Sequence, residues 1–266
     1  MRLIDSHGHL NADRFADDVD LVVGAARLAG VERIMVPGWN VASSHRALDL
    51  LDRHPWLDAA VGVHPHDAAK VDASGWEEII AMAADPRVLA IGETGLDYDR
   101  AFSPIPDQLH NLRRNLDLAA TTGKPVILHC RSAAGRRDAQ DALLAEVRAI
   151  GPSGPRVVIH SFSGPVDYAE AMLELGATIS LSGLVFRRGE EPSAEVAEIV
   201  PADRLLVETD SPFLAAPGAP RSRNEPAYVG ITATWLADRR RVDRRVLGAG
   251  LVDAYDRTFA RASRPS

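Results

Sequence analysis

Five short apolar runs, each leading into residues that can bind a metal ion, restrict the fold of this chain more than any other feature. The runs and the residues that follow them span 3–9, 88–93, 125–129, 156–160 and 205–210. A continuous apolar run of about four to six residues with many β-branched side chains is typical of a strand buried on both faces. Parallel strands point their carboxyl ends the same way, so the residues at those ends can gather at one mouth of a barrel.

Strand-like and helix-like segments alternate along the chain. The strand-like segments are 3–9, 33–37, 57–63, 88–93, 125–129, 156–160, 178–181 and 205–208. The helix-like segments are 17–28, 43–54, 76–84, 108–120, 138–150, 165–175 and 193–200, and two more, 226–240 and 243–261, close the chain. Eight strands, each followed by a helix, predict a parallel α/β architecture with right-handed crossovers.

The candidate ligands favour one of two such architectures, a TIM (β/α)8 barrel over an open doubly wound sheet. Ligands at the first, fourth, fifth, sixth and eighth strands meet only if the sheet closes. The length of 266 residues is also close to the roughly 250 that are typical of a (β/α)8 barrel. Because the sequence has no internal repeat or linker, we predict one TIM-barrel domain over residues 1–266 with an extra C-terminal helix.

Six residues at these strand ends form a candidate site for two divalent metal ions. They are His7, His9, Glu93, His129, His160 and Asp210. His7 and His9 are two residues apart, so on a strand both imidazoles face the same side and can bind one ion. Glu93 has two carboxylate oxygens and can bridge two ions that lie a few ångströms apart.

The remaining ligands suggest the chemistry. His129 and His160, expected on neighbouring strands, can complete the set of ligands around the second ion. Asp210 can bind the first ion, next to a water molecule. Two divalent ions about 3.5–4 Å apart acidify such a water and polarise a substrate oxygen. A carboxylate beside the water can collect its proton as general base. The expected reaction is a hydrolysis in which Asp210 and Glu93 are the catalytic carboxylates.

Seven motifs, spread nearly from one end of the chain to the other, resemble those of the TatD-type metal-dependent hydrolases. They are DSHGHL at 5–10, GVHPH at 62–66, IGETGLDY at 91–98, VILHCR at 126–131, HSFSG at 160–164, ETDSP at 208–212 and RNEPAYV at 223–229. The resemblance implies an amidohydrolase-like TIM barrel and a divalent-metal deoxyribonuclease, often a 3′-to-5′ exonuclease. By position, it implies one ion bound by His7, His9, Glu93 and Asp210, and another bound by Glu93, His129 and His160.

Three further residues are candidates for substrate binding at the same mouth. His64 follows the third strand, and can donate to a substrate phosphate or hydrogen-bond a loop backbone. Arg131 ends the fifth strand, and can bind a phosphate oxygen or form an ion pair with Asp97 or Asp99. Arg223 lies in the last loop, and can clamp a phosphate or hold that loop in place. Asp97 is not a candidate for substrate binding, but it can orient a histidine that binds a metal ion.

Composition and charge limit the partners and the location. The formal net charge of −7 argues against broad contact with duplex DNA. It does not argue against a small phosphate-bearing substrate, because two bound divalent ions would add positive charge at the mouth. The single Cys130 fits a reducing compartment, and no apolar run approaches the roughly 18 residues of a membrane span. The first residues show no signal-peptide pattern, so we expect a cytoplasmic protein without an obligate protein partner.

These features together predict a metal-dependent phosphodiesterase that acts on DNA ends or oligonucleotides. An enzymatic alternative keeps the site and changes the bond, as in an ester or amide hydrolase such as a D-aminoacyl-tRNA deacylase. A metal-binding scaffold is a non-catalytic alternative, which the complete set of six ligands argues against. Mixed histidine and carboxylate ligation suits Zn²⁺, Mn²⁺, Fe²⁺ or Ni²⁺ about equally well, and Mg²⁺ least.

Overall fold

Eight parallel strands form one sheet in sequence order in the computed structural model, which describes residues 1–259. The strands are β1 (Leu3–Asp5), β2 (Val31–Pro37), β3 (Asp58–Val61), β4 (Val88–Asp97), β5 (Val126–Arg131), β6 (Val157–Ile159), β7 (Thr178–Leu181) and β8 (Leu205–Val207). The backbone N–H of Ser6 donates to the carbonyl of Val207 at 3.0 Å, and Gly8 forms a parallel bridge with Ser211. The last strand therefore meets the first, and the predicted TIM barrel is confirmed.

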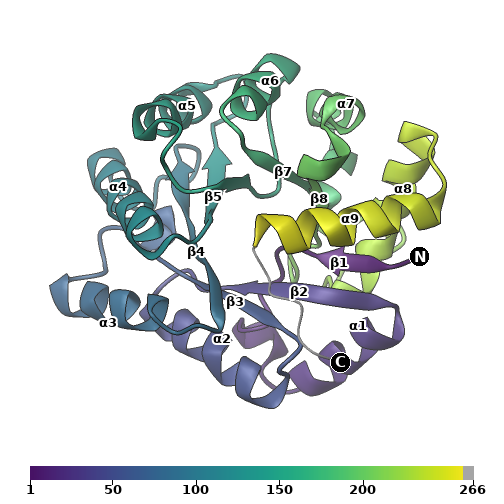
Figure 1. Cartoon of the computed structure of the whole chain (residues 1–266), viewed down its shortest axis with the longest axis horizontal. Coiled ribbons are helices and arrows are strands. Elements are labelled where there is room, and N and C mark those ends of the chain that lie inside the picture. The colour runs from purple at the N-terminus through teal and green to yellow at the C-terminus, as the bar shows by residue number, and fades with distance from the viewer. Residues whose placement is uncertain (260–266) are drawn as a thin grey trace.

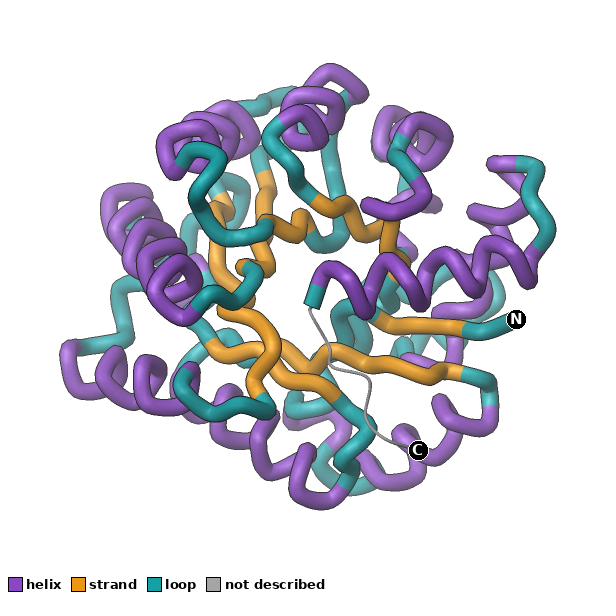
Figure 2. The backbone as a smooth tube through the Cα atoms, viewed as in Figure 1, coloured by secondary structure: helices purple, strands orange, loops and turns teal. Residues whose placement is uncertain are grey.

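Helices surround the ring of strands, as the tube in Figure 2 shows most clearly, with the strands orange inside the purple helices. The helices are α1 (Val19–Leu28), α2 (Val41–Arg53), α3 (Ala73–Ala83), α4 (Ile105–Thr122), α5 (Asp138–Ile150), α6 (Val166–Glu174), α7 (Glu191–Ile199), α8 (Val229–Arg240) and α9 (Arg244–Thr258). Short 3-10 helices lie at Asp13–Phe15, Pro65–Asp67, Gly183–Phe186, Ala202–Arg204 and Pro226–Tyr228. None of the helices within residues 1–259 is both long and apolar enough to cross a membrane.

The apolar core is continuous from the strands to the inner faces of the helices. Ile91 of β4 and Val126 of β5 are completely buried, as are Ala119 of α4 and Leu143 of α5. This burial on both faces explains why the strands are continuous apolar runs in the sequence. Polar side chains are costly to bury along such strands, so the histidines and carboxylates that could bind metal ions lie near the carboxyl ends, where the barrel opens.

Helix α9 covers the opposite, amino-terminal end of the barrel, and lies beside β1 (Figure 1). It approaches the start of the chain so closely that a Cβ on Gly248 would lie 2.5 Å from the carbonyl oxygen of Arg2. The Tyr255 hydroxyl of α9 also donates to Asp58 Oδ2, at the start of β3, at 2.9 Å. The predicted extra C-terminal helix is thus confirmed, although its expected end at residue 261 lies outside the described residues.

The end of β4 that we predicted from the sequence was wrong. We expected the strand to end at Glu93, but it continues to Asp97 because its pairing with β5 resumes at Thr94 and Leu128 and runs to Asp97 and Arg131. The register shifts between Ile91 and Thr94, so Glu93 lies at an irregularity of the strand. Such irregularities re-aim a side chain toward a site. The other strands and helices differ from expectation by a few residues at their ends.

Candidate metal centre

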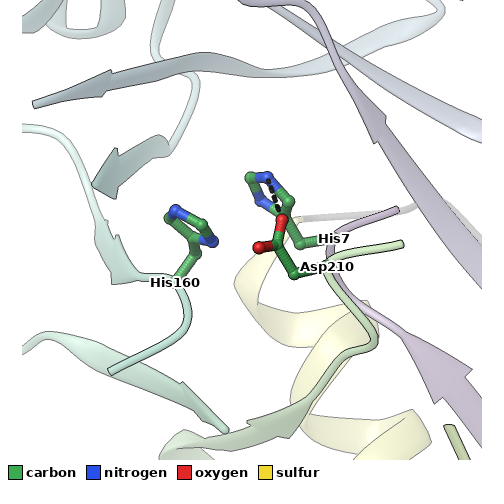
Figure 3. A group of neighbouring side chains, drawn as sticks. All are labelled: His7, His160 and Asp210. Carbon is green, nitrogen blue, oxygen red and sulfur yellow. Dashed lines mark ion pairs between the residues drawn. The ribbon is translucent and has the colours of Figure 1, made fainter. Parts of the chain in front are cut away.

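One group of side-chain atoms converges where β1, β4 and β8 open at the mouth. The Nε2 atoms of His7 and His9 lie 3.2 Å apart, and they are 3.3 and 3.5 Å from Glu93 Oε2. Asp210 Oδ1 lies 3.4 Å from His9 Nε2 and 3.9 Å from His7 Nε2. Figure 3 shows Asp210 and His7 side by side, with His160 facing them from another strand. Two imidazoles and two carboxylates thus point at one small volume.

A second group surrounds the other oxygen of Glu93. Glu93 Oε1 lies 2.8 Å from His160 Nε2, 3.3 Å from His129 Nδ1 and 3.2 Å from His64 Nε2. His129 Nδ1 and His160 Nε2 are themselves 3.3 Å apart. The two groups are adjacent, since the rings of His7 and His160 stack with centroids 3.9 Å apart. Glu93 therefore presents one oxygen to each group, which is the arrangement of a bridging carboxylate.

Glycine packing holds Glu93 in this position. A Cβ on Gly62, just beyond β3, would lie 2.7 Å from the Cα of Gly92. Gly92 itself has φ +131°, a conformation that side chains rarely adopt, and a Cβ there would lie 2.7 Å from the carbonyl of Ile127. The Glu93 N–H then donates to the carbonyl of Gly38 at 2.7 Å. Glycines at both positions allow three neighbouring backbones to approach beneath the carboxylate.

Two buried carboxylates orient the histidines of the second group. Glu208 Oε1 accepts a hydrogen bond from His160 Nδ1 at 3.1 Å, so in the neutral ring Nε2 is the atom that can present a lone pair to the centre. Asp97 Oδ2 lies 3.4 Å from His129 Nε2 and 2.7 Å from His66 Nε2. We expected Asp97 to orient a ligand histidine; its carboxylate lies in ion-pair contact with His129, although His129 Nε2 has no hydrogen-bond partner within residues 1–259. Glu208, which is hydrogen-bonded to its histidine, was missed, although its position directly after the apolar run of β8 marked it.

Asp5 is another residue whose role the sequence did not reveal. Its carboxylate is fully buried and accepts hydrogen bonds from the backbone N–H groups of His7 and Thr209, at 3.3 and 2.9 Å. The Thr209 hydroxyl donates to it as well, at 2.6 Å. Burial raises the pKa of Asp5 to about 8. Through these hydrogen bonds, Asp5 connects the segment that carries His7 to the segment that carries Asp210.

His64 enters the second group with a defined tautomer. Its Nδ1 accepts a hydrogen bond from the backbone N–H of His66 at 3.1 Å, so the ring proton of the neutral form is on Nε2. Burial lowers the pKa of His64 to about 4, which keeps the ring neutral near pH 7. His64 therefore faces Glu93 with an N–H group. That group is a hydrogen-bond donor and cannot be a metal ligand in the same tautomer.

The sequence of this chain matches the family model described as TatD related DNase over residues 4–260. The chain belongs to this family. It is 36% identical over 263 residues to the 3′-5′ ssDNA/RNA exonuclease TatD of Salmonella typhimurium, covering 97% of this chain and 98% of that protein. It is 33% identical over 236 residues to the uncharacterized metal-dependent hydrolase YabD of Bacillus subtilis, covering 89% and 90%.

Solved structures agree with the assignment of this TatD-family chain. The crystal structure of YjjV, a TatD homologue from Escherichia coli K12, superposes with a TM-score of 0.88 at 29% identity, covering 98% of this chain and 99% of that one. A TatD-family hydrolase from Entamoeba histolytica superposes with a TM-score of 0.86 at 21% identity, over 97% and 98%, and supports the fold. The resemblance seen in the motifs is thus confirmed, and the chain is a TatD-type metal-dependent hydrolase.

The chemistry of the first group in this TatD-family chain fits a divalent cation. The two Nε2 atoms of His7 and His9 face each other and two carboxylate oxygens, so a single proton cannot satisfy all four lone pairs. Both Nδ1 atoms of these rings are buried without a hydrogen-bond partner in the part of the chain described. A cation bound by these four atoms would accept one lone pair from each of them at once.

Electrostatics also keep the acids of the centre ionised. Burial raises the pKa of Glu93, but the neighbouring histidines, led by His160, outweigh it and hold the pKa well below its ordinary value. Burial is the largest single influence on Asp210 and raises its pKa, but His9, His160 and His7 together outweigh it and lower the pKa. Burial lowers the pKa of His160, while Glu93 and Glu208 raise it well above the usual value. Ionised carboxylates and imidazoles therefore stabilise one another at the centre.

The two arginines that were predicted to bind substrate have different contacts in the structure. Arg131 is about half exposed, and its guanidinium pairs with Asp99, with Nη2 2.7 Å from Oδ2. Arg223 forms a two-point ion pair with Asp18, each contact at 2.8 Å, and Nη2 also lies 2.8 Å from Glu225 Oε1. Its contacts thus match the alternative in which Arg223 holds the last loop in place.

Proposed function

We propose that this TatD-type hydrolase is a nuclease that removes nucleotides from the ends of single-stranded DNA or RNA, with two divalent ions at its centre. The observation that carries the proposal is the placement of Glu93, whose two oxygens face two separate histidine groups. The relative from Salmonella typhimurium, similar over nearly its whole length, is named a 3′-5′ ssDNA/RNA exonuclease. The same reaction, at the 3′ end, is the one we assign to this chain.

The six residues of the two groups would hold the ions. One ion would take His7, His9, Glu93 and Asp210, and the other Glu93, His129 and His160. Such ions supply Lewis acidity at a phosphoryl oxygen and acidify a water when bound. The mixture of imidazole and carboxylate suits Zn²⁺, Mn²⁺, Fe²⁺ or Ni²⁺ better than Mg²⁺.

Asp210 is the general base of the proposed reaction. Its lowered pKa keeps the carboxylate ionised at neutral pH, so it can accept a proton. As the oxygen of the attacking water bonds to phosphorus, Asp210 takes a proton from that water, the bond to the leaving oxygen breaks, and the leaving oxygen gains a proton from solvent. General-base groups of this kind typically contribute about 10²–10⁴-fold to the rate.

His64 and Arg131 would bind the phosphate. The Nε2–H of His64 points at the centre and can donate to a non-bridging phosphate oxygen. Within residues 1–259, the one ion-pair partner of the half-exposed Arg131 is Asp99, and exposed pairs of this kind are weak, so a phosphate can compete for the guanidinium. Arg223 has no part in the proposal. A cytoplasmic location remains a prediction based on the free thiol of Cys130.

The test compares two classes of substrate on purified protein loaded with Zn²⁺, Mn²⁺ or Mg²⁺. We expect stepwise shortening of a 5′-labelled single-stranded oligonucleotide, DNA or RNA. A protein in which all six ligands bind metal, yet which leaves both oligonucleotides intact and rapidly deacylates D-aminoacyl-tRNA, would establish the alternative ester hydrolase.

A further inference from the structure

Two exposed phenylalanine side chains flank the candidate metal centre. Phe213 is 52% exposed and Phe102 is 62% exposed. They are the only aromatic side chains among the strongly exposed large hydrophobic residues within the described part of the chain. The other exposed hydrophobic side chains are aliphatic or methionine, as is usual for single apolar residues scattered over a surface.

Phe213 stands beside the first ligand group. Its ring lies edge-on to the ring of His9, with centroids 6.1 Å apart. Its backbone N–H donates to the carbonyl of Asp210 at 2.8 Å, and its carbonyl accepts from Asn224 Nδ2 at 2.7 Å. Asn224 is itself buried and also donates to the carbonyl of Thr209 at 2.9 Å. The backbone that carries Phe213 is therefore fixed on both sides, while more than half of the side chain is open to solvent.

Phe102 stands beside the second ligand group. Its ring lies edge-on to the ring of His66 at 4.7 Å, and His66 shares the Asp97 carboxylate with the candidate ligand His129. The next residue, Ser103, is fully buried and donates to the carbonyl of His66 at 3.0 Å. This anchor fixes the loop on which Phe102 is exposed. Each ligand group thus has one solvent-exposed aromatic ring next to it, on a backbone segment that hydrogen bonds hold in place.

A third aromatic residue at the mouth differs from these two. Trp39 also lies edge-on to His9, at 5.2 Å, but the guanidinium of Arg46 lies 5.6 Å from its ring centroid. Trp39 therefore already has a cationic partner. No such cation accompanies Phe102 or Phe213 among the residues that the structure describes.

We propose that Phe213 and Phe102 are stacking platforms for two unpaired nucleobases, one on each side of the scissile phosphate. The inference rests on the proposed nuclease function and adds how the strand is selected. Aromatic rings bind single-stranded nucleic acid because every base has a π face, whereas bases inside a duplex are already stacked. Platforms that accept any base also suit an enzyme that shortens strands of any sequence. The net charge of −7 argues against a broad basic surface as the main source of affinity, and base stacking needs no such surface.

The experiment measures KM and kcat for the metal-loaded wild-type enzyme and for the variants Phe213→Ala and Phe102→Ala. Each is assayed on a single-stranded oligonucleotide and on the same strand with abasic residues at its two terminal positions. We expect each variant to raise KM for the normal strand roughly five- to hundredfold, with little change in kcat. On the abasic strand, wild type and variants should have similar KM values, because the stacking partner is already absent. Phe213→Trp should retain a low KM, whereas Phe213→Leu should not.

Leu28→Ala is the matched control, since Leu28 is an exposed hydrophobic side chain at the end of α1. The proposal is wrong if the phenylalanine variants raise KM no more than this control. It is also wrong if they raise KM equally on the abasic strand, since their effect would then not depend on the bases. A wild-type enzyme that cleaves neither strand refutes the nuclease proposal itself, and the stacking inference fails with it. If the wild-type enzyme cleaves both strands and the phenylalanine variants have unchanged KM values, only the stacking inference is refuted.

Discussion

Replacing Glu208 by glutamine tests whether a carboxylate outside the ligand set controls metal binding. Glu208 is fully buried, and it accepts a hydrogen bond from His160 Nδ1 at 3.1 Å and one from the Ser6 hydroxyl at 3.3 Å. Glutamine keeps the volume and removes the charge that raises the pKa of His160. If the new amide group donates to Nδ1, the ring proton moves to Nε2 and His160 can no longer be a ligand. If the amide oxygen accepts instead, the hydrogen bond is weaker because its acceptor is neutral.

Either outcome lowers metal affinity. Loss of a carboxylate that orients a ligand histidine typically costs about 10–100-fold in affinity, or roughly 1.4–2.8 kcal/mol. Chelator competition with Zn²⁺ measures that loss, and thermal unfolding of the metal-free protein checks that the variant is folded. Asp58→Asn is the matched control, because Asp58 is a buried carboxylate at the opposite end of the barrel, bonded to Tyr255. A folded Glu208→Gln protein that binds both ions with wild-type affinity refutes the reasoning.

Three further predictions concern individual side chains. Asp210→Asn should lower kcat by about 10²–10⁴-fold while the protein stays folded and still binds an oligonucleotide, and a variant with more than roughly a tenth of wild-type kcat would show that another group is the base. Arg131→Ala should raise KM for oligonucleotides more than it lowers kcat, as steady-state kinetics would show; an effect on kcat alone would place Arg131 in the chemical step. Burial raises the pKa of the Cys130 thiol to about 12, so the native protein at pH 8 should resist iodoacetamide until it is unfolded; rapid alkylation, followed by mass spectrometry, would contradict that burial.

The barrel and the six convergent residues were predictable from the sequence for one physical reason. A strand buried on both faces must be apolar along its length, so a histidine or carboxylate at its end is conspicuous. Closing the sheet then brings ends that are far apart in the sequence to one mouth. His7 and Asp210 are 203 positions apart, yet His7 Nε2 lies 3.9 Å from Asp210 Oδ1.

The residues that the sequence could not assign depend on contacts between segments whose spacing is not fixed by periodicity. Arg223 pairs with Asp18 near the start of α1, and nothing in either local sequence indicates that partner. The tautomer of His64 follows from one backbone N–H two residues away, which depends on the turn at 64–67. The irregularity of β4 at Glu93 depends on how closely Gly62 and Gly92 approach each other. Patterns in sequence locate the strand ends, whereas packing decides which way the side chains there point.

The number of metal ions bound per chain tests the central claim most directly. Wild-type protein is stripped with chelator, reconstituted with excess Mn²⁺ or Zn²⁺, freed of loose metal by gel filtration and analysed for its metal content. We expect close to two ions per chain for the wild type, and a larger loss for Glu93→Gln than for any other single ligand substitution, because Glu93 faces both groups. A folded wild-type protein that retains at most one ion under these conditions would contradict the two-ion centre.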